Sequence, residues 1–204
     1  MKYKSIFKLC LLTTFLSVAT ISCDDWTEME IHDSQVNGFK EQNPQEYAVY
    51  TQNLRAYKAT KHAVVYARLD NAPEVSTGEK DFLRALPDSI DIVTMRNADR
   101  LSEYDREDMK LVREDYGTKV LYYIDCTAKD KLNTSITSAV EAVRAGTFDG
   151  IALGSEGSAV DVSALKPLLD ALGQTPCLLV FEGTPSLLPE AQRSLFNYFV
   201  LDIS

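Results

Sequence analysis

The chain contains 204 residues, of which 45% are apolar and 25% are charged, and its formal net charge is −9. This composition is typical of a folded globular protein and excludes a low-complexity chain. The acidic balance argues against nucleic acid as a partner. The two histidines, His32 and His62, have no partner at metal-ligand spacing, so we expect neither a metal site nor any other cofactor.

The N-terminus carries a targeting signal. Three lysines within the first eight residues precede an apolar run over residues 9–21, which is too short to span a bilayer and is typical of a secretory signal. The following residues 19–23, Ala-Thr-Ile-Ser-Cys, resemble the lipobox of bacterial lipoproteins. That resemblance implies cleavage after residue 22 and lipidation of Cys23; the alternative is an ordinary cleaved signal.

Asp24 and Asp25 follow directly and are similar to the acidic tag of surface-exposed lipoproteins. We therefore expect a lipid anchor in the bacterial outer membrane with the protein facing the cell exterior, periplasmic retention being the alternative.

Residues 23–44 are polar and predict a lipidated tether that ends at Pro44. Tyr47, Tyr50, Leu54 and Tyr57 then recur at helical spacing. The pattern predicts an amphipathic helix over 45–58 whose apolar stripe packs on the domain.

From residue 62 onward, short apolar runs alternate with amphipathic segments. The runs cover 62–69, 90–95, 119–124, 148–153, 177–181 and 198–203, and the first four intervals are each about 29 residues long, the length of one strand–helix unit. The intervening helices are expected at Thr77–Ala85, Glu103–Tyr116, Ser135–Ala145, Val162–Leu172 and Pro189–Asn197. Gly117, Gly146 and Gly173 fit left-handed residues at the ends of three of these helices.

This alternation predicts an α/β fold with a parallel, TIM-barrel-like sheet over residues 45–204. About six units are present, whereas a closed (β/α)8 barrel needs eight strands and typically about 250 residues. We expect an incomplete or truncated barrel; the alternative is a complete open sheet of six strands.

One segment carries a specific motif. Residues 148–156 read Phe-Asp-Gly-Ile-Ala-Leu-Gly-Ser-Glu, and strand alternation places Gly150, Ala152, Gly154 and Glu156 on one face. The segment resembles the strand-four signature of family 18 glycoside hydrolases, the chitinases and endo-β-N-acetylglucosaminidases, in which four acids occur in the pattern DxxDxDxE.

Asp149 and Glu156 match the first and last acids of this signature, whereas Ala152 and Gly154 replace the two acids between them. The resemblance implies that Glu156 would be the general acid, and that Asp149 and Gly150 are structural. The missing acid at position 154 would orient the N-acetyl group of the substrate, whose carbonyl oxygen is the nucleophile.

A general acid needs a raised pKa, and the acetamido group must be held in place for hydrolysis. Because both neighbouring acids are missing, we expect a non-catalytic, cell-surface lipoprotein that binds glycans containing N-acetylglucosamine, such as N-glycans, beside an outer-membrane glycan importer. Two alternatives stay open: a weakly active hydrolase that uses Glu156, and a decayed fragment without a ligand.

Polar side chains follow the ends of the predicted strands, where a barrel has its active face. The candidate substrate-binding residues are Asp70, Asn71, Arg96, Asn97, Asp125, Glu182 and Asp202. Cys126 follows the end of one strand and Cys177 opens another, so we expect free thiols at opposite ends of the sheet.

Overall fold

A computed structural model describes residues 38–71, 75–76, 78–155, 157–160, 162–173 and 175–201, without the side chains of 162–164. The predicted signal peptide, Cys23, Glu156 and Asp202 lie outside the described residues. The chain divides into two units, residues 1–44 and 45–204. Of the first unit, the structure describes residues 38–44, which include the short helix α2 (Phe39–Gln42).

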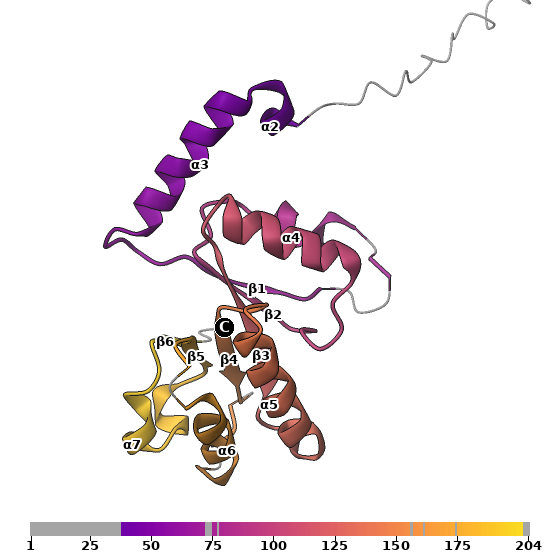
Figure 1. Cartoon of the computed structure of the whole chain (residues 1–204). Helices are drawn as coiled ribbons and strands as arrows, with labels where there is room; N and C mark the ends of the chain where they lie inside the picture. The colour runs from indigo at the N-terminus through magenta and orange to yellow at the C-terminus, as the bar shows by residue number, and fades with distance from the viewer. Residues whose placement is uncertain are drawn as a thin grey trace, which may run out of the picture. The chain divides into compact units, whose positions relative to one another are not determined.

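The second unit contains a parallel sheet, which among the described residues has six strands in the order β1-β2-β3-β4-β5-β6. The strands are β1 (Tyr66–Leu69), β2 (Ile92–Met95), β3 (Lys119–Asp125), β4 (Gly150–Gly154), β5 (Leu178–Glu182) and β6 (Tyr198–Val200). Each strand pairs with the next one along the chain, and the sheet curls into a half-barrel (Figure 1). The predicted TIM-barrel-like α/β fold is confirmed.

Helices follow β2 to β5 as the sequence predicts; the helix over residues 162–172 has the predicted bounds, and the bounds of the others differ. The α-helices of this unit are α3 (Pro44–Lys58), α4 (Glu103–Glu114), α5 (Lys129–Arg144), α6 (Val162–Leu172) and α7 (Glu190–Arg193). Gly117, Gly146 and Gly173 follow α4, α5 and α6 with φ angles of 71°, 73° and 55°, which confirms the left-handed residues expected there.

One predicted helix is wrong. Instead of a helix over 77–85, the chain forms two single 3₁₀ turns, η1 (Glu79–Asp81) and η2 (Leu83–Ala85). Phe82 between them is extended, with φ −105° and ψ 133°, which interrupts the helical hydrogen bonds. A third 3₁₀ turn, η3 (Pro185–Leu187), precedes α7, which covers only part of the helix expected over 189–197.

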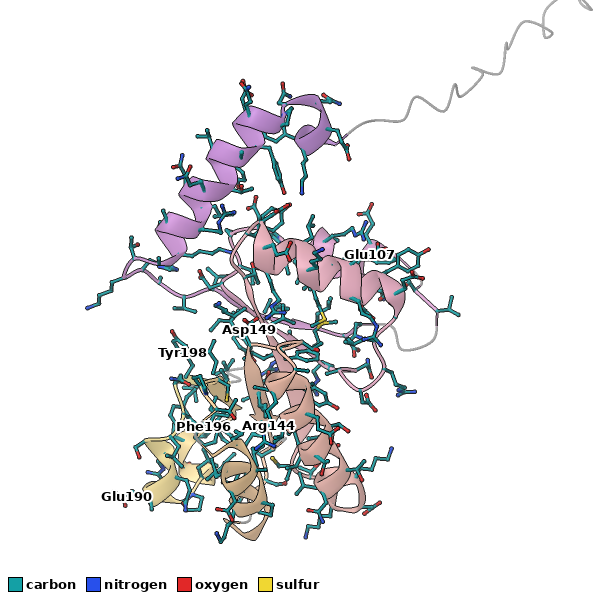
Figure 2. All side chains as sticks on the ribbon, viewed as in Figure 1. Glu107, Arg144, Asp149, Glu190, Phe196 and Tyr198 are labelled. Atoms are coloured by element: carbon teal, nitrogen blue, oxygen red, sulfur yellow. The ribbon has the colours of Figure 1, made fainter. Side chains whose placement is uncertain are left out.

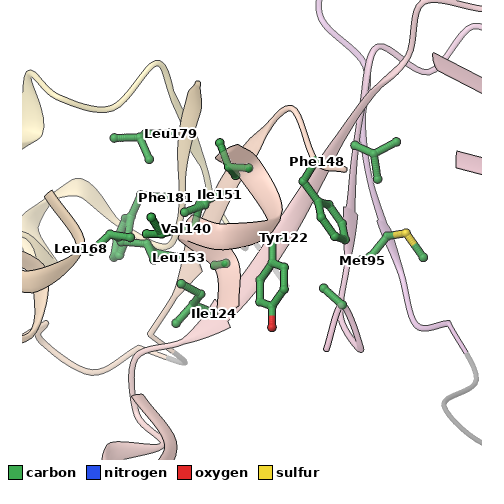
Figure 3. Packing of buried hydrophobic residues seen from close by; sticks show 14 of the residues in the cluster. Met95, Tyr122, Ile124, Val140, Phe148, Ile151, Leu153, Leu168, Leu179 and Phe181 are labelled. Carbon is green, nitrogen blue, oxygen red and sulfur yellow. The ribbon is translucent and has the colours of Figure 1, made fainter. Parts of the chain in front are cut away.

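Both faces of the sheet are buried. The larger hydrophobic cluster lies between the sheet and the helices, where Val140 of α5 and Leu168 of α6 pack with Ile151, Leu153 and Phe181 of the strands (Figure 3). A smaller cluster covers the inner face and comprises Ile92, Leu121, Tyr123, Ala152 and Val180. The alternation of large and very small residues along β4 therefore separates these two clusters, as the sequence predicts.

Gly150 on this inner face is required by its neighbour. A Cβ atom at this position would lie 2.1 Å from the carbonyl oxygen of Leu178 on β5, which is backbone and cannot yield. Glycine at position 150 therefore allows β4 and β5 to approach each other.

Helix α3 is held by polar contacts and not by the expected apolar stripe. Thr51 is its one buried residue, and the side chains of Tyr50 and Tyr57 are 42% and 53% exposed. The hydroxyl of Tyr47 donates to Asp115 at 2.7 Å, and the hydroxyl of Tyr50 donates to Asp88. The prediction of an apolar stripe failed because Tyr47 and Tyr50 carry hydroxyl groups, which donate to carboxylates directly after α4 and in the segment before β2.

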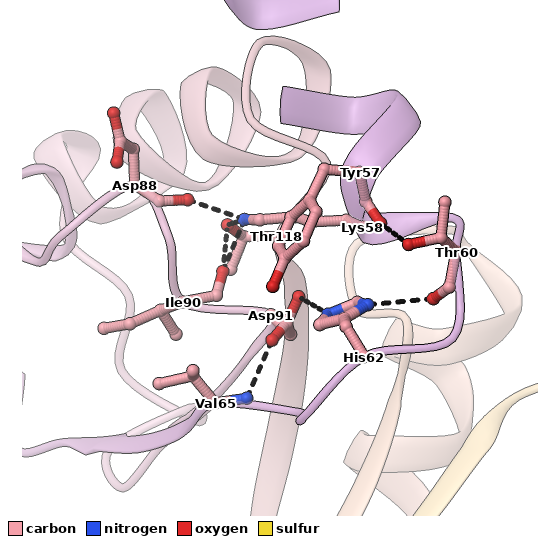
Figure 4. A network of polar contacts seen from close by, with 9 residues as sticks. All are labelled: Tyr57, Lys58, Thr60, His62, Val65, Asp88, Ile90, Asp91 and Thr118. Atoms are coloured by element: carbon pink, nitrogen blue, oxygen red, sulfur yellow. Dashed lines mark hydrogen bonds and ion pairs between the residues drawn. The ribbon is translucent and has the colours of Figure 1, made fainter. Parts of the chain in front are cut away.

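The end of α3 is anchored by Lys58 (Figure 4). Its ammonium group donates to the carbonyl oxygens of Asp88 at 2.7 Å and Ile90 at 2.6 Å, and to the hydroxyl of Thr118 at 3.0 Å. Partial burial lowers the pKa of Lys58, while the carboxylates of Asp91 and Asp88 oppose that shift. Three acceptors therefore join α3 to the segments that enter β2 and β3.

Cys126 and Cys177 are free thiols. Cys126 directly follows β3 and Cys177 directly precedes β5, so they lie at opposite ends of the parallel strands, as expected. Burial raises the pKa of Cys126 to about 12, with a further contribution from Asp125, so this thiol is unreactive at neutral pH.

Candidate functional site

A pocket of about 420 Å³ opens at the carboxyl ends of the strands. Its described lining comes from β1, β3, β4 and β5 and from the segments that follow β2, β4 and β5: Arg68, Arg96, Tyr123, Gly154, Gly157, Glu182, Gly183, Thr184 and Leu187. The size lies within the range of about 300–1,000 Å³ that is usual for small-ligand sites, and the position is where barrels place their active sites.

Glu182 at the end of β5 is the polar centre of the pocket. Its side chain is 2% exposed, and its carboxylate pairs with Nε of Arg68 at 2.9 Å and with Nη1 of Arg96 at 3.4 Å. It also accepts a hydrogen bond of 2.5 Å from the hydroxyl of Tyr66. A buried charge needs such partners, so the network explains how a carboxylate is tolerated inside the half-barrel.

Tyr66 stays protonated in this network. Burial raises its pKa well above the usual value, and the neighbouring carboxylate of Glu182 raises it further. The phenol therefore donates to Glu182 and contacts the hydroxyl of Thr94 on β2.

Tyr123 and Arg96 form the wall of the pocket beside β4. The guanidinium carbon of Arg96 lies 3.7 Å from the centroid of the Tyr123 ring. A Cβ atom at Gly154 would lie only 2.1 Å from the hydroxyl oxygen of Tyr123. The tyrosine therefore occupies the space that a side chain at position 154 would need.

The environment of Ala152 is also unsuited to an acid. This residue is completely buried on the inner face, in the cluster that contains Leu121, Tyr123 and Val180. A carboxylate there would be surrounded by apolar side chains.

Two of the predicted substrate-binding residues, Arg96 and Glu182, line the pocket. The described lining does not include four other predicted residues: Asp70, Asn71, Asn97 and Asp125. Glu156 falls between the pocket residues Gly154 and Gly157 in the sequence but lies outside the described residues, as does Asp202.

The two asparagines join the loops after β1 and β2. Asn71 is completely buried; its side-chain oxygen accepts from the backbone amide of Asn97 at 3.0 Å, and its amide donates to the carbonyl of Asn97 at 3.3 Å. The amide of Asn97 donates back to the carbonyl of Asn71 at 2.6 Å. These groups therefore stabilise the rim of the site through contacts within the protein.

Asp125 has a similar local role. One carboxylate oxygen accepts from the backbone amide of Thr127 at 2.8 Å and from its hydroxyl at 2.6 Å. This geometry is an Asx turn that ends β3.

Sequence reasoning missed both Arg68 and Tyr123 as pocket residues. A signal for Arg68 exists, because an arginine inside an apolar strand run needs a partner within the fold. The position of Tyr123 against Gly154 has no sequence signal, because it depends on the register between β3 and β4.

Asp149 lies at the opposite, amino-terminal end of β4 (Figure 2). Its carboxylate pairs with Nε of Arg113 at 2.9 Å and accepts from the backbone amide of Val120 at 3.0 Å. These contacts join β4 to β3 and to α4, far along the strand from the pocket residue Gly154.

Among the residues that the structure describes, no group of three or more potential ligand side chains could hold a metal ion. Within that same part of the chain, no helix is both long and apolar enough to cross a membrane.

The fold is that of a TIM-barrel-like α/β protein, and it has a pocket at the carboxyl ends of its strands. The family model described as glycoside hydrolase family 18, BT1044-like, matches residues 27–145, and the chain belongs to this family. The match ends before the segment 148–156.

A solved structure of a selenomethionine glutamate-to-glutamine variant of BT1044 is similar, with a TM-score of 0.64 and 16% sequence identity. The similarity covers 80% of this chain and 64% of that one, so the chain spans less than two thirds of the length of this neighbour. The chitinase domain of the spore coat protein CotE from Clostridium difficile matches with a TM-score of 0.43 and 14% identity, over 71% of this chain and 50% of that one. No curated protein sequence matches significantly.

Proposed function

We propose that this protein is a non-catalytic glycan-binding member of its family, which captures glycans containing N-acetylglucosamine, such as N-glycans. The observation that carries the proposal is the contact between positions 123 and 154: the phenol of Tyr123 fills the space of the side chain that would orient a substrate acetamido group. The pocket is present, but position 154 has no side chain that could hold the acetamido group, whose carbonyl oxygen would be the nucleophile.

The remaining polar groups of the pocket suit binding. Arg96 and Thr184 offer hydrogen-bond donors to a ligand in the pocket. The buried carboxylate of Glu182 is committed to Arg68 and Tyr66, so it serves to fix the pocket rather than to transfer a proton.

The proposed setting is the bacterial cell surface. A lipid on Cys23 would anchor the protein in the outer membrane, and a glycan importer in the same membrane would receive the captured glycan. The lipobox-like residues 19–23 and the following acidic pair support this setting. Mass spectrometry of protein extracted from the native membrane tests it, because a diacylated N-terminal peptide starting at Cys23 is expected.

A second function, weak endo-β-N-acetylglucosaminidase activity with Glu156 as the general acid, is favoured by one observation. Glu156 stands in the sequence between Gly154 and Gly157, and both glycines line the pocket. Turnover that disappears in Glu156→Gln would support this alternative.

Isothermal titration with a purified neutral N-glycan tests the main proposal. We expect saturable one-to-one binding that is weakened at least about tenfold by Tyr123→Ala, a change of about 1.4 kcal/mol. Absence of saturable binding to the folded protein would reject the capture function.

A further inference from the structure

The charged groups of the pocket indicate which glycans it prefers. Among the described lining residues, two arginines, Arg68 and Arg96, face one carboxylate, that of Glu182.

Arg96 is the less neutralised of the two arginines. Its Nη1 atom is 3.4 Å from Glu182, whereas the shorter contacts of that carboxylate go to Nε of Arg68 at 2.9 Å and to the hydroxyl of Tyr66 at 2.5 Å. No other hydrogen bond of the Arg96 guanidinium is found within the described part of the chain. Most of its N–H groups are therefore available to a ligand.

The position of Arg96 is fixed before a ligand arrives. Stacking at 3.7 Å on the ring of Tyr123 holds the plane of the guanidinium, and the side chain is 31% exposed at the pocket. An immobilised guanidinium loses little conformational entropy on binding and offers two parallel N–H groups to a planar acceptor.

A carboxylate is the acceptor that fits such a fork, because it accepts two parallel hydrogen bonds in one plane. We propose that the pocket prefers glycans that carry a carboxylate, as sialic acids and uronic acids do, and that Arg96 binds this group. The inference rests on the proposed glycan-binding function and adds the class of ligand. Long-range repulsion by the acidic protein is screened within about 8 Å at physiological salt, so the local contacts decide the preference.

The experiment compares one glycan with and without its acidic ends. A sialylated biantennary N-glycan and the same glycan after sialidase treatment are titrated into the purified protein at about 0.15 M salt, and the two affinities are compared. We expect the sialylated form to bind at least about tenfold more tightly. In Arg96→Met the ratio should fall to near one, and Arg96→Lys should keep only part of the preference because it lacks the fork.

Lys110→Met is the matched control, since it removes an exposed positive charge from α4 outside the pocket and should leave the ratio unchanged. The comparison of the two glycans on the unmodified protein remains decisive even where an Arg96 variant does not fold. Equal binding of both glycans would overturn the acidic preference while supporting glycan capture. Binding of neither would reject the capture function and the preference with it.

Discussion

The hydroxyl of Tyr123 lies where the side chain of residue 154 would have to start: a Cβ atom on Gly154 would be 2.1 Å from that oxygen and 2.7 Å from two ring carbons. Tyr123 on β3 and Gly154 on β4 are offset by two residues in the strand register, since Ala152 is opposite Tyr123 and Gly154 is opposite Asp125. The absence of a side chain at position 154 and the position of the Tyr123 ring are thus parts of one packing arrangement.

Restoring an acid at position 154 should therefore destabilise the protein. We expect Gly154→Asp to lower the free energy of unfolding by about 1–3 kcal/mol, because Tyr123 must leave its place beside Arg96. Urea-induced unfolding measures the change. Gly78→Ala is the control, because a Cβ atom there meets nothing within 4 Å, and its effect should stay within about 0.5 kcal/mol.

A double-mutant cycle then tests the direct contact. The combined variant Tyr123→Leu with Gly154→Asp should cost at least about 1 kcal/mol less than the sum of the two single changes, because the smaller side chain removes the clash. Additive effects would show that the two positions do not compete for space.

The charge network around Glu182 should contribute to stability. Glu182→Gln removes the negative charge that pairs with Arg68 and Arg96, and we expect a loss of about 1–3 kcal/mol, less than for a fully buried pair because the arginine side chains are 38% and 31% exposed. Glu107→Gln is the matched control, since Glu107 is 62% exposed and pairs with Arg84 at 3.6 Å. A Glu182 effect no larger than that of the control would contradict a structural role for the network.

Lys58 should be the main anchor of α3. Lys58→Met removes three hydrogen bonds to Asp88, Ile90 and Thr118, and we expect a loss of about 1–3 kcal/mol in chemical denaturation. Lys61→Met, at an exposed position, should have little effect. Equal stability of the two variants would mean that α3 is held by other contacts.

The stability should also depend on pH through His62. The hydrogen bond between its Nε2 atom and Asp91, at 2.9 Å, raises the pKa of His62, and the contact of Nδ1 with the carbonyl of Thr60 adds to this (Figure 4). A raised pKa means that the folded state binds the proton more tightly. The contribution is therefore complete below the unfolded pKa of about 6.5 and is lost as the pH rises through the folded pKa.

The stability difference between the unmodified protein and His62→Gln should consequently be larger near pH 5.5 than near pH 8.5. Urea denaturation at the two pH values measures it. A difference that is constant with pH, or that grows toward pH 8.5, would contradict the assigned partner.

The order and type of the strands could be predicted because each apolar run and its spacing are local properties of the sequence. The two 3₁₀ turns over residues 79–85 could not be predicted, because the extended conformation of one residue, Phe82, is what divides the expected helix into two turns. The anchoring of α3 was also missed, since the acceptors of Lys58 lie 30 to 60 residues further along the chain.

The site was predictable only in part, for the same physical reason. Arg96 and Glu182 follow strand runs and could be assigned to the carboxyl edge. The contact of Tyr123 with the space beside Gly154 depends on the register of two strands, and the pairing of Arg68 with Glu182 joins residues of β1 and β5. The first relationship depends on the register of neighbouring strands, and the second depends on the curvature that brings β1 and β5 together. Neither can be read from the local sequence.

The most direct test of the account is product analysis by mass spectrometry on a complex of the protein with a saturating N-glycan, after calorimetry has established that the glycan is bound. The account predicts an intact glycan after prolonged incubation and unchanged affinity in Glu156→Gln. Release of cleaved glycan by the unmodified protein but not by Glu156→Gln would contradict it and establish hydrolysis as the function of the pocket.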